Sequence, residues 1–170
     1  VGAAMGSTDA CVSYRLRLQN LNRGIRLVDT PGILEAGDAG QRREQLARKQ
    51  AAEADLLLLV VDGDLRAAEQ EVFLALAQLG KRLLLVLNKC DLRGSDEERR
   101  LLALLRRRCQ GRIAPEDVIA ASAAPQSVPM PGGKPLQPEP ELDALLRRIA
   151  QVLHSDGEEL IADNILMQSR

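Results

Sequence analysis

Aromatic residues are nearly absent from this chain of 170 residues, which has one tyrosine, one phenylalanine and no tryptophan. Any hydrophobic core must therefore be built from leucine, valine, isoleucine and alanine. The chain also lacks an apolar run of roughly 20 residues, the length that a membrane-spanning helix requires. These absences, with a length that suits one domain, predict a globular domain with an aliphatic core.

Cysteine and net charge are also scarce. The three cysteines, Cys11, Cys90 and Cys109, form no CxxC pair, and an odd number favours a reducing compartment. The formal net charge is -1, which gives no general attraction to nucleic acid or to an acidic membrane. The first residues show no pattern of a secretion signal. We therefore expect a cytoplasmic protein, and membrane association through regions outside this chain stays open.

Dense apolar runs alternate with helical patterns along most of the chain. Short runs flanked by breakers are typical of strands covered on both faces. They span 56–61, 83–87 and 117–121, and helical patterns span 66–79, 95–108 and 140–153. A capping-box pattern, Ser95-Asp96-Glu97-Glu98, opens the second of these helices. The alternation predicts an α/β fold with a mostly parallel sheet.

The segment before this alternation has a different pattern. Apolar residues at 12, 14, 16 and 18 alternate with polar ones, which indicates a half-exposed edge strand. A turn signal at 20–24 separates it from an apolar run at 25–28. We expect these two strands to pair antiparallel. A mobile loop at 33–40 and a helix at 41–54 are expected to follow.

Three short motifs stand at the ends of predicted strands. Asn88-Lys89-Cys90-Asp91 follows the run 83–87, Asp29-Thr30-Pro31-Gly32 follows 25–28, and Ser122-Ala123 follows the strand at 117–121. Ligands of open α/β sheets bind beyond the carboxyl ends of the strands. The three motifs are therefore expected to converge on one edge of the sheet.

The order and type of these motifs resemble the third, fourth and fifth boxes of a translation-factor-class, Era-like P-loop GTPase. The resemblance implies a three-layer Ras-like domain over residues 1–156 with an antiparallel edge strand, followed by a helical connector over 157–170. It also implies a switch that binds GTP and GDP with Mg²⁺ and hydrolyses GTP to GDP.

Asp91 has the chemistry to select guanine. Its carboxylate presents two adjacent acceptors, which match the adjacent N1–H and N2–H₂ donors of guanine, and adenine offers no such pair. A site built for buried hydrogen bonds rejects a base that leaves its groups unpaired. By the resemblance, Asn88 and Lys89 also contact the base, and a backbone N–H of the Ser122-Ala123 segment meets guanine O6.

The other end of the nucleotide falls, by the resemblance, to Asp29, Gly32 and Thr8. Asp29 reaches Mg²⁺, the Gly32 N–H contacts the γ-phosphate, and Thr8 is the candidate switch threonine that binds Mg²⁺. Ile33 occupies the position of the glutamine that orients the attacking water in Ras-type enzymes. The catalytic group is therefore unknown, and we expect slow hydrolysis that a protein partner or self-association stimulates.

The first box of the family, GxxxxGK[ST], is missing from these residues. The segment Gly2–Thr8 is one residue short, has no lysine and precedes a strand pattern, whereas a phosphate loop opens a helix. We expect the box, and the central strand before it, to lie upstream of Val1. That strand would lie between the strands ending at Val28 and Val61. The 170-residue chain alone is then expected to bind nucleotide poorly or not at all.

Two other functions stay open at this point. The first is a nucleotide-free interaction module with a GTPase-like fold. The second is an RNA- or ribosome-associated domain in which Arg106–Arg108 contact RNA, although such arginines more often form a solvated helix face. Residues 124–140, with six of the eight prolines, read either as a partner loop or as a disordered insertion. A peripheral membrane role of residues 158–170 also stays open.

Overall fold

The computed structural model describes residues 12–17, 24–30 and 49–154. The chain divides into two compact units, one of Val1–Leu57 with Arg66–Arg82 and one of Leu58–Leu65 with Leu83–Arg170. Three candidate site residues, Thr8, Gly32 and Ile33, lie outside the described residues. The same holds for the expected loop at 33–40, for most of the expected helix at 41–54, of which 49–53 are seen as helix, and for the connector at 157–170.

The first unit contains the predicted antiparallel pair. Strand β1 (Val12–Arg17) pairs with β2 (Gly24–Asp29) from Val12 opposite Asp29 to Arg17 opposite Gly24. The pairing confirms the prediction. The expected half-buried face of β1 is wrong, because all six of its residues are exposed and the Tyr14 side chain is 51% exposed. Among the described strands, β1 pairs with β2 alone, and the two form a two-stranded sheet.

Helix α2 (Ala67–Ala77) also belongs to the first unit. The Glu69 side chain accepts the backbone N–H of Arg66 at 2.8 Å, which caps the start of the helix. Gly80, with φ of +66°, lies shortly after the helix end. The buried residues of the helix are Glu69 and Phe73, one turn apart, whereas Leu79 after the helix is 41% exposed. Phe73 occupies the core position because its ring buries more apolar area than a leucine side chain.

The second unit is built on a three-stranded sheet in the order β3 (Leu56–Val61), β4 (Arg82–Leu87), β5 (Val118–Ala120), most of β3 lying in this unit. Strands β4 and β5 are parallel, so the α/β prediction is confirmed. Five of the six residues of β4 are buried, as predicted for a strand covered on both faces. The same expectation fails for β3, where Val60 is 56% exposed, because among the described strands of this sheet β3 lies at the edge and β4 at the centre.

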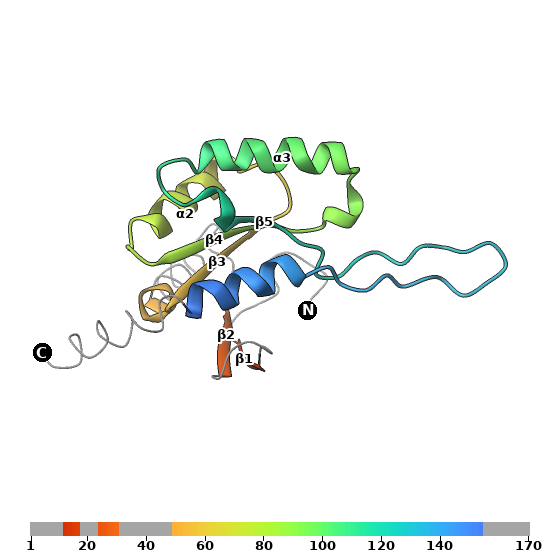
Figure 1. Cartoon of the computed structure of the whole chain (residues 1–170), viewed down its shortest axis with the longest axis horizontal. Helices are drawn as coiled ribbons and strands as arrows, with labels where there is room; N and C mark the ends of the chain where they lie inside the picture. Colours follow the sequence, from red (N-terminus) through yellow and green to blue (C-terminus); the bar gives the residue numbers. More distant parts are fainter. Residues whose placement is uncertain (1–11, 18–23, 31–48, 155–170) are drawn as a thin grey trace, which may run out of the picture. The chain divides into compact units, whose positions relative to one another are not determined.

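Two helices of the second unit lie on opposite sides of this sheet (Figure 1). Helix α3 (Ser95–Arg108) packs near β5 and buries Leu105 completely. The second helix spans residues 143–154 and is tied to the segment before β5 by an ion pair of 2.8 Å between Arg148 and the buried Asp117.

The start of α3 differs in detail from the capping-box prediction. Gly94 is the N-cap and Ser95 is already helical, so the serine hydroxyl does not cap the helix. Three acidic residues in the first turn and three arginines in the last turn still complement the helix dipole.

The aliphatic core predicts a clear stability effect. Leu85, in the middle of β4, is fully buried, and its replacement by alanine would leave a cavity in the sheet layer. We expect Leu85→Ala to lower the free energy of unfolding by about 2–5 kcal/mol, measured by urea denaturation. Leu136→Ala is the matched control, because Leu136 is 57% exposed. A loss at Leu85 no larger than at Leu136 would contradict this core assignment.

Candidate functional site

The chain turns sharply where β4 ends, and the turn positions the Asn88–Asp91 motif. The Asn88 N–H donates to the Val61 carbonyl at 2.7 Å, which ties this end of β4 to the end of β3. Lys89 then adopts a left-handed conformation, with φ of 60° and ψ of 37°, before the short 3₁₀ helix η1 (Cys90–Leu92). A non-glycine residue in this region costs about 1–3 kcal/mol and persists where surrounding contacts hold it.

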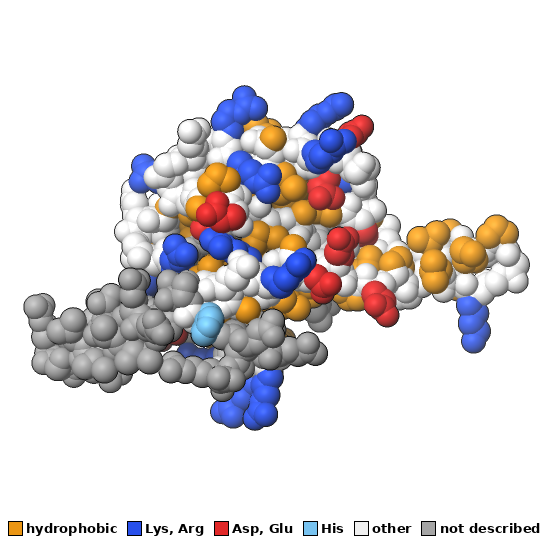
Figure 2. All heavy atoms as spheres, in the orientation of Figure 1, with side chains coloured by type: hydrophobic (Ala, Val, Ile, Leu, Met, Phe, Trp, Pro, Cys, Tyr) orange, Lys and Arg blue, Asp and Glu red, His pale blue; other side chains and the backbone are white. Residues whose placement is uncertain are grey.

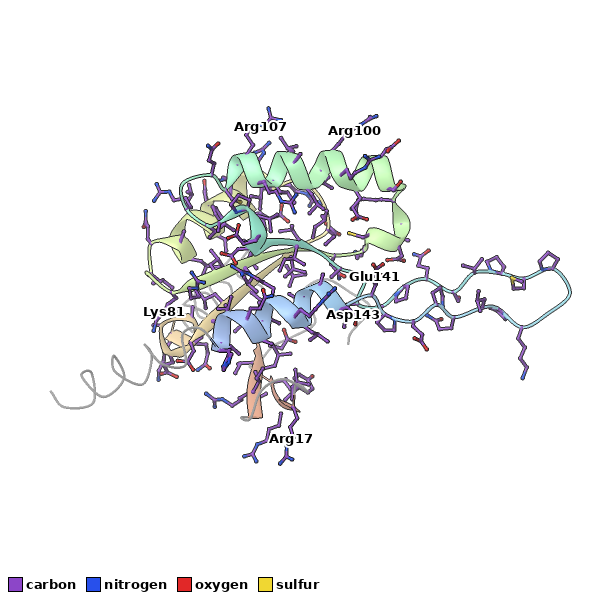
Figure 3. The ribbon with its side chains drawn as sticks, in the orientation of Figure 1. Arg17, Lys81, Arg100, Arg107, Glu141 and Asp143 are labelled. Carbon is purple, nitrogen blue, oxygen red and sulfur yellow. The ribbon has the colours of Figure 1, made fainter. Side chains whose placement is uncertain are left out.

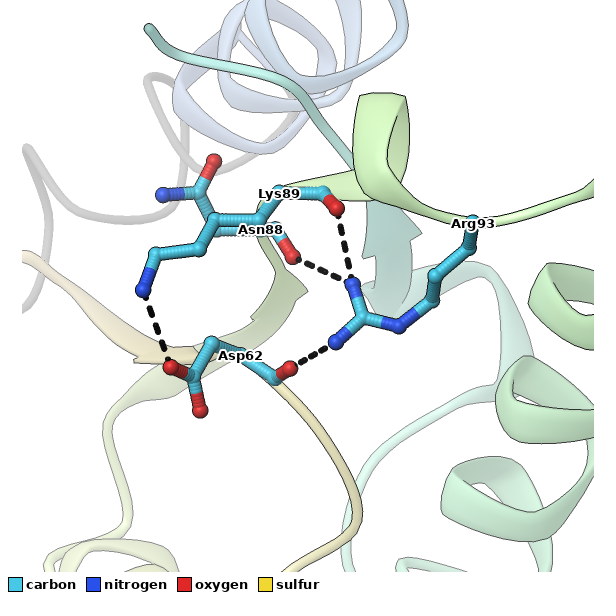
Figure 4. A network of polar contacts seen from close by, with 4 residues as sticks. All are labelled: Asp62, Asn88, Lys89 and Arg93. Atoms are coloured by element: carbon cyan, nitrogen blue, oxygen red, sulfur yellow. Dashed lines mark hydrogen bonds and ion pairs between the residues drawn. The ribbon is translucent and has the colours of Figure 1, made fainter. Parts of the chain in front are cut away.

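The Arg93 side chain supplies much of that support. One of its terminal nitrogens donates to the carbonyls of Lys89 at 2.8 Å and Asn88 at 3.2 Å, and the other donates to the carbonyl of Asp62 (Figure 4). The Lys89 ammonium pairs with the Asp62 carboxylate at 3.0 Å. The planar guanidinium is suited to several acceptors at once, so Arg93 fixes the ends of β3 and β4 in one network.

Cys90 fills the free position of the motif and fastens it to β5. The Cys90 N–H donates to the Ala121 carbonyl at 3.2 Å, and the Ala121 N–H donates to the Leu87 carbonyl at 2.8 Å. The buried Cys90 thiol lies 3.3 Å from the Leu87 carbonyl, as its hydrogen-bond donor. Burial raises the pKa of this thiol, which keeps it protonated and unreactive. Cys90 is therefore a small structural residue of the turn.

The motif at the end of β5 meets the first motif directly. The Ala123 N–H donates to the Asn88 side-chain oxygen at 3.0 Å. The buried Ser122 hydroxyl donates to Asp91 Oδ1 at 2.6 Å, and the Gln126 N–H donates to Asp91 Oδ2 at 3.1 Å. The structure thus brings together four of the five residues predicted to bind guanine, and the fifth, Lys89, lies in the same turn.

These contacts also set the charge of Asp91. The hydrogen bond from Ser122, followed by that from Gln126, holds the pKa of the Asp91 carboxyl below its usual range. Arg93 contributes in the same direction. Asp91 is itself exposed, so its carboxylate stays ionised and accessible while both of its oxygens are held in place. Such a group can accept two further donors side by side.

The predicted phosphate-binding residues are described only in part. Asp29 is an exposed residue at the end of β2, in the first unit. Thr8, Gly32 and Ile33 lie outside the described residues, so their roles stay predictions. Among residues 12–17, 24–30 and 49–154, no cluster of three or more His, Cys, Asp or Glu side chains could hold a metal ion.

The three arginines considered for RNA contact, Arg106–Arg108, have different contacts in the structure. Arg106 donates to the carbonyls of Pro115 and Val118, and Arg108 pairs with Asp64 at 2.8 Å. Arg107 is exposed and, like Arg100, points away from α3 (Figure 3). Two of the three arginines therefore serve the fold, which weakens the case for a continuous RNA-binding strip.

Three contributors to this site were missed in the sequence, namely Asp62, Arg93 and Gln126. Asp62 carried a usable signal, because it directly follows a predicted strand whose end lies at the same sheet edge. Arg93 and Gln126 carried none, since the former acts on carbonyls and the latter through its backbone N–H.

The described elements form a partial Ras-like GTPase domain, with a parallel three-stranded sheet and an antiparallel pair. The chain belongs to the family of 50S ribosome-binding GTPases, whose model matches residues 1–89. The match ends at Lys89, so it includes the start of the motif after β4.

Individual relatives agree with this family. The chain is 42% identical over 69 residues to the tRNA modification GTPase MnmE of Geobacter sulfurreducens, covering 40% of this chain and 15% of the relative. It is 41% identical over 93 residues to GTPase Der of Nautilia profundicola, covering 54% and 20%. It is 35% identical over 142 residues to GTPase Der of Xanthomonas campestris pv. campestris, covering 81% and 26%. The chain thus spans about a quarter or less of these relatives.

The Arg93 network predicts a stability effect larger than that of a surface arginine. Arg93→Met removes the donor for three backbone carbonyls while keeping an unbranched side chain. We expect the free energy of unfolding to fall by about 1–3 kcal/mol, because partly buried acceptors lose a charged donor. Arg100→Met, at an exposed position of α3, is the matched control. Equal effects of the two variants would show that Arg93 does not support the turn.

The hydrogen bond from the Ser122 hydroxyl leads to a prediction about the pKa of the Asp91 carboxyl. We expect Ser122→Ala to raise the pKa of the Asp91 carboxyl towards its usual range, measured by NMR titration of the side-chain carbon. Because the native pKa is lowered, the stability from this contact is present above the unfolded pKa of about 3.9 and is lost as the pH falls through the native pKa. Ser122→Ala should therefore lose less stability on acidification. Ser127→Ala, at an exposed position nearby, is the control, and an unchanged Asp91 pKa in Ser122→Ala would refute the assignment.

Proposed function

We propose that this chain forms the base-recognition part of an Era-like regulatory GTPase, which binds guanine nucleotides and hydrolyses GTP to GDP as a switch. The observation that carries the proposal is the meeting of two strand-end motifs. Asn88 and Asp91 follow β4, Ser122 and Ala123 follow β5, and hydrogen bonds of 2.6 to 3.0 Å join the two pairs. The family membership supports the guanine nucleotide as ligand.

The geometry indicates how guanine would be read. The ionised Asp91 carboxylate accepts the adjacent N1–H and N2–H₂ donors of the base, with its oxygens already oriented by Ser122 and Gln126. The Ala123 N–H, now held by the Asn88 side chain, is positioned to donate to guanine O6. Lys89, whose side chain is 54% exposed, can lay its methylene stem along the ring. Adenine lacks the paired donors and would leave Asp91 unsatisfied.

The phosphate end is assigned to Asp29, Gly32 and Thr8. Nucleotide-bound Mg²⁺ is held by one or two protein carboxylates together with phosphate oxygens, so the single exposed carboxylate of Asp29 is chemically sufficient. The ion would neutralise charge on the transferred phosphate. Ile33 cannot orient water by hydrogen bonding, which leaves that role to a partner, to a second copy or to another group.

The proposed setting is cytoplasmic, with a protein partner or self-association as the stimulus for hydrolysis. The description of the family suggests the ribosome as a partner of the whole protein. None of the described helices has the length and apolar character needed to cross a membrane. Residues 1–156 are proposed as the GTPase domain and 157–170 as a connector, through which peripheral membrane contact remains the alternative to a ribosomal one.

A nucleotide-free interaction module is the second candidate function. It is favoured by one sequence observation, the lack of GxxxxGK[ST] within these 170 residues. Such a module would retain the fold and the contacts between Asn88, Asp91 and Ser122 as structure alone. Nucleotide binding by the protein at its natural length separates the two candidates.

The decisive test is titration of fluorescently labelled GDP into the full-length protein and into the 170-residue chain, with GTP and ATP as competitors. We expect the full-length protein to bind, GTP to compete and ATP not to compete. Asp91→Asn should weaken GDP binding by about 10- to 100-fold, because a charged acceptor is lost. It should improve binding of xanthosine diphosphate, whose C2 carbonyl accepts from an amide.

Asp96→Asn is the matched control, since Asp96 is an exposed aspartate in the first turn of α3. It should leave both affinities unchanged. If neither protein binds GDP, the interaction module is the better account. If Asp91→Asn binds GDP as the wild type does, Asp91 does not select the base.

A further inference from the structure

Residues 124–140, called the arm from here on, project from the second unit as a long excursion between β5 and the helix at 143–154 (Figure 1). Backbone hydrogen bonds cross it at two levels. Ser122 and Glu141 exchange bonds of 3.0 and 2.9 Å at its base, and Val128 and Leu136 exchange bonds of 2.8 and 2.9 Å further out. The arm is therefore a paired structure with a fixed root, and of the two sequence interpretations the disordered insertion is wrong.

The outer part of the arm differs from its root. Hydrophobic side chains gather along the projection in the space-filling view (Figure 2), and Val128, Met130 and Leu136 are 47 to 57% exposed. At the root, Pro125 is buried, whereas Gln137 is exposed and Pro138 is the one half-buried residue of 131–140. The backbone carbonyl of a buried residue calls for a hydrogen-bond donor.

The peptide between Pro125 and Gln126 finds its donor across the root of the arm. The Gln137 side-chain amide donates to the Pro125 carbonyl at 2.8 Å. The N–H of the same peptide, on Gln126, donates to Asp91 Oδ2 at 3.1 Å. The described peptide bonds are all trans, so the carbonyl and the N–H of one unit point in opposite directions. The peptide thus bridges Gln137 on one side and Asp91 on the other.

The bridge acts on the orientation of the Asp91 carboxylate. Ser122 holds Oδ1 and the Gln126 N–H holds Oδ2, one donor to each oxygen, so the plane of the carboxylate is fixed and each oxygen keeps a further acceptor site. A peptide that accepts a hydrogen bond at its oxygen is also a stronger donor at its nitrogen, because chains of hydrogen bonds polarise one another. The Gln137 amide therefore strengthens and aims the contact to Oδ2.

We propose that Gln137 is a positioning residue of the guanine site, which acts through the Pro125–Gln126 peptide to orient the Asp91 carboxylate. The proposal rests on the function proposed above, since it gives the root of the arm a part in selecting the base. The arm then belongs to the site through two hydrogen bonds, and it does not need to touch the nucleotide itself.

The test compares Gln137→Met with wild type in two measurements. Methionine keeps the length of the side chain and removes the amide donor without adding charge. In the unliganded 170-residue chain, the pKa of Asp91, followed by NMR, should rise, because the Gln126 N–H is less well held. In the full-length protein, the preference for GDP over inosine diphosphate, which lacks the N2 amine, should fall by about 3- to 10-fold.

Two control variants define what a structural role alone would give. Gln110→Met makes the same chemical change at an exposed position after α3, and Leu136→Ala alters an exposed side chain next to Gln137 without removing a donor. Both should leave the Asp91 pKa and the nucleotide preference unchanged. A Gln137→Met protein that loses stability while both readouts stay at wild-type values would overturn the proposal.

The two measurements also separate the proposal from the function on which it rests. If the wild-type protein binds no guanine nucleotide, the proposed function fails, while a raised Asp91 pKa in Gln137→Met still supports the positioning of Asp91 by Gln137. If GDP binds with the expected selectivity and neither readout responds to Gln137→Met, the proposed function stands and Gln137 has no part in it.

Discussion

The parallel pairing of β4 with β5 is the constraint on which the candidate base site depends. It sets Leu87 opposite Ala120, and therefore brings the two motifs that follow these strands to the same sheet edge. Side chains alternate along a strand, so a shift of one residue would turn each motif to the opposite face. The bond from the Ala121 N–H to the Leu87 carbonyl extends the register by one residue, to the point where the polar groups begin.

Beyond that point the site is held by its own hydrogen bonds. Strand ends leave backbone groups that need partners, and Arg93 donates hydrogen bonds to three such carbonyls. Ser122 and Gln126 donate hydrogen bonds to the Asp91 carboxylate. A site organised before its ligand arrives spends less of the binding energy on ordering side chains. In the proposed function, binding would exchange hydrogen bonds already present, such as that between Ala123 and Asn88, for bonds to the base.

Much of the fold and the pairing of the two motifs could be predicted, because β4 is a continuous apolar run and the motifs follow strands. The solvent exposure of Val60 on β3 could not, since burial of a strand depends on which neighbours flank it in the sheet. Ser95 has the chemistry of an N-cap, yet the backbone turns at Gly94. Gln137 was invisible because its contact joins one side chain to a distant peptide carbonyl, and neither group has a pattern of its own.

The left-handed backbone conformation of Lys89 lowers the local stability, whereas its side chain contributes to the chemistry of the candidate site. Glycine adopts such a conformation without the steric cost that a side chain carries. Lysine instead brings an ammonium that pairs with Asp62 and a stem exposed enough to lie along a ring. Sequence design or laboratory evolution guided by thermostability alone would therefore favour glycine at position 89 and erase part of the site. The contacts of its side chain thus account for a lysine at a strained position, and a search for strained non-glycine residues could find similar turns in other chains.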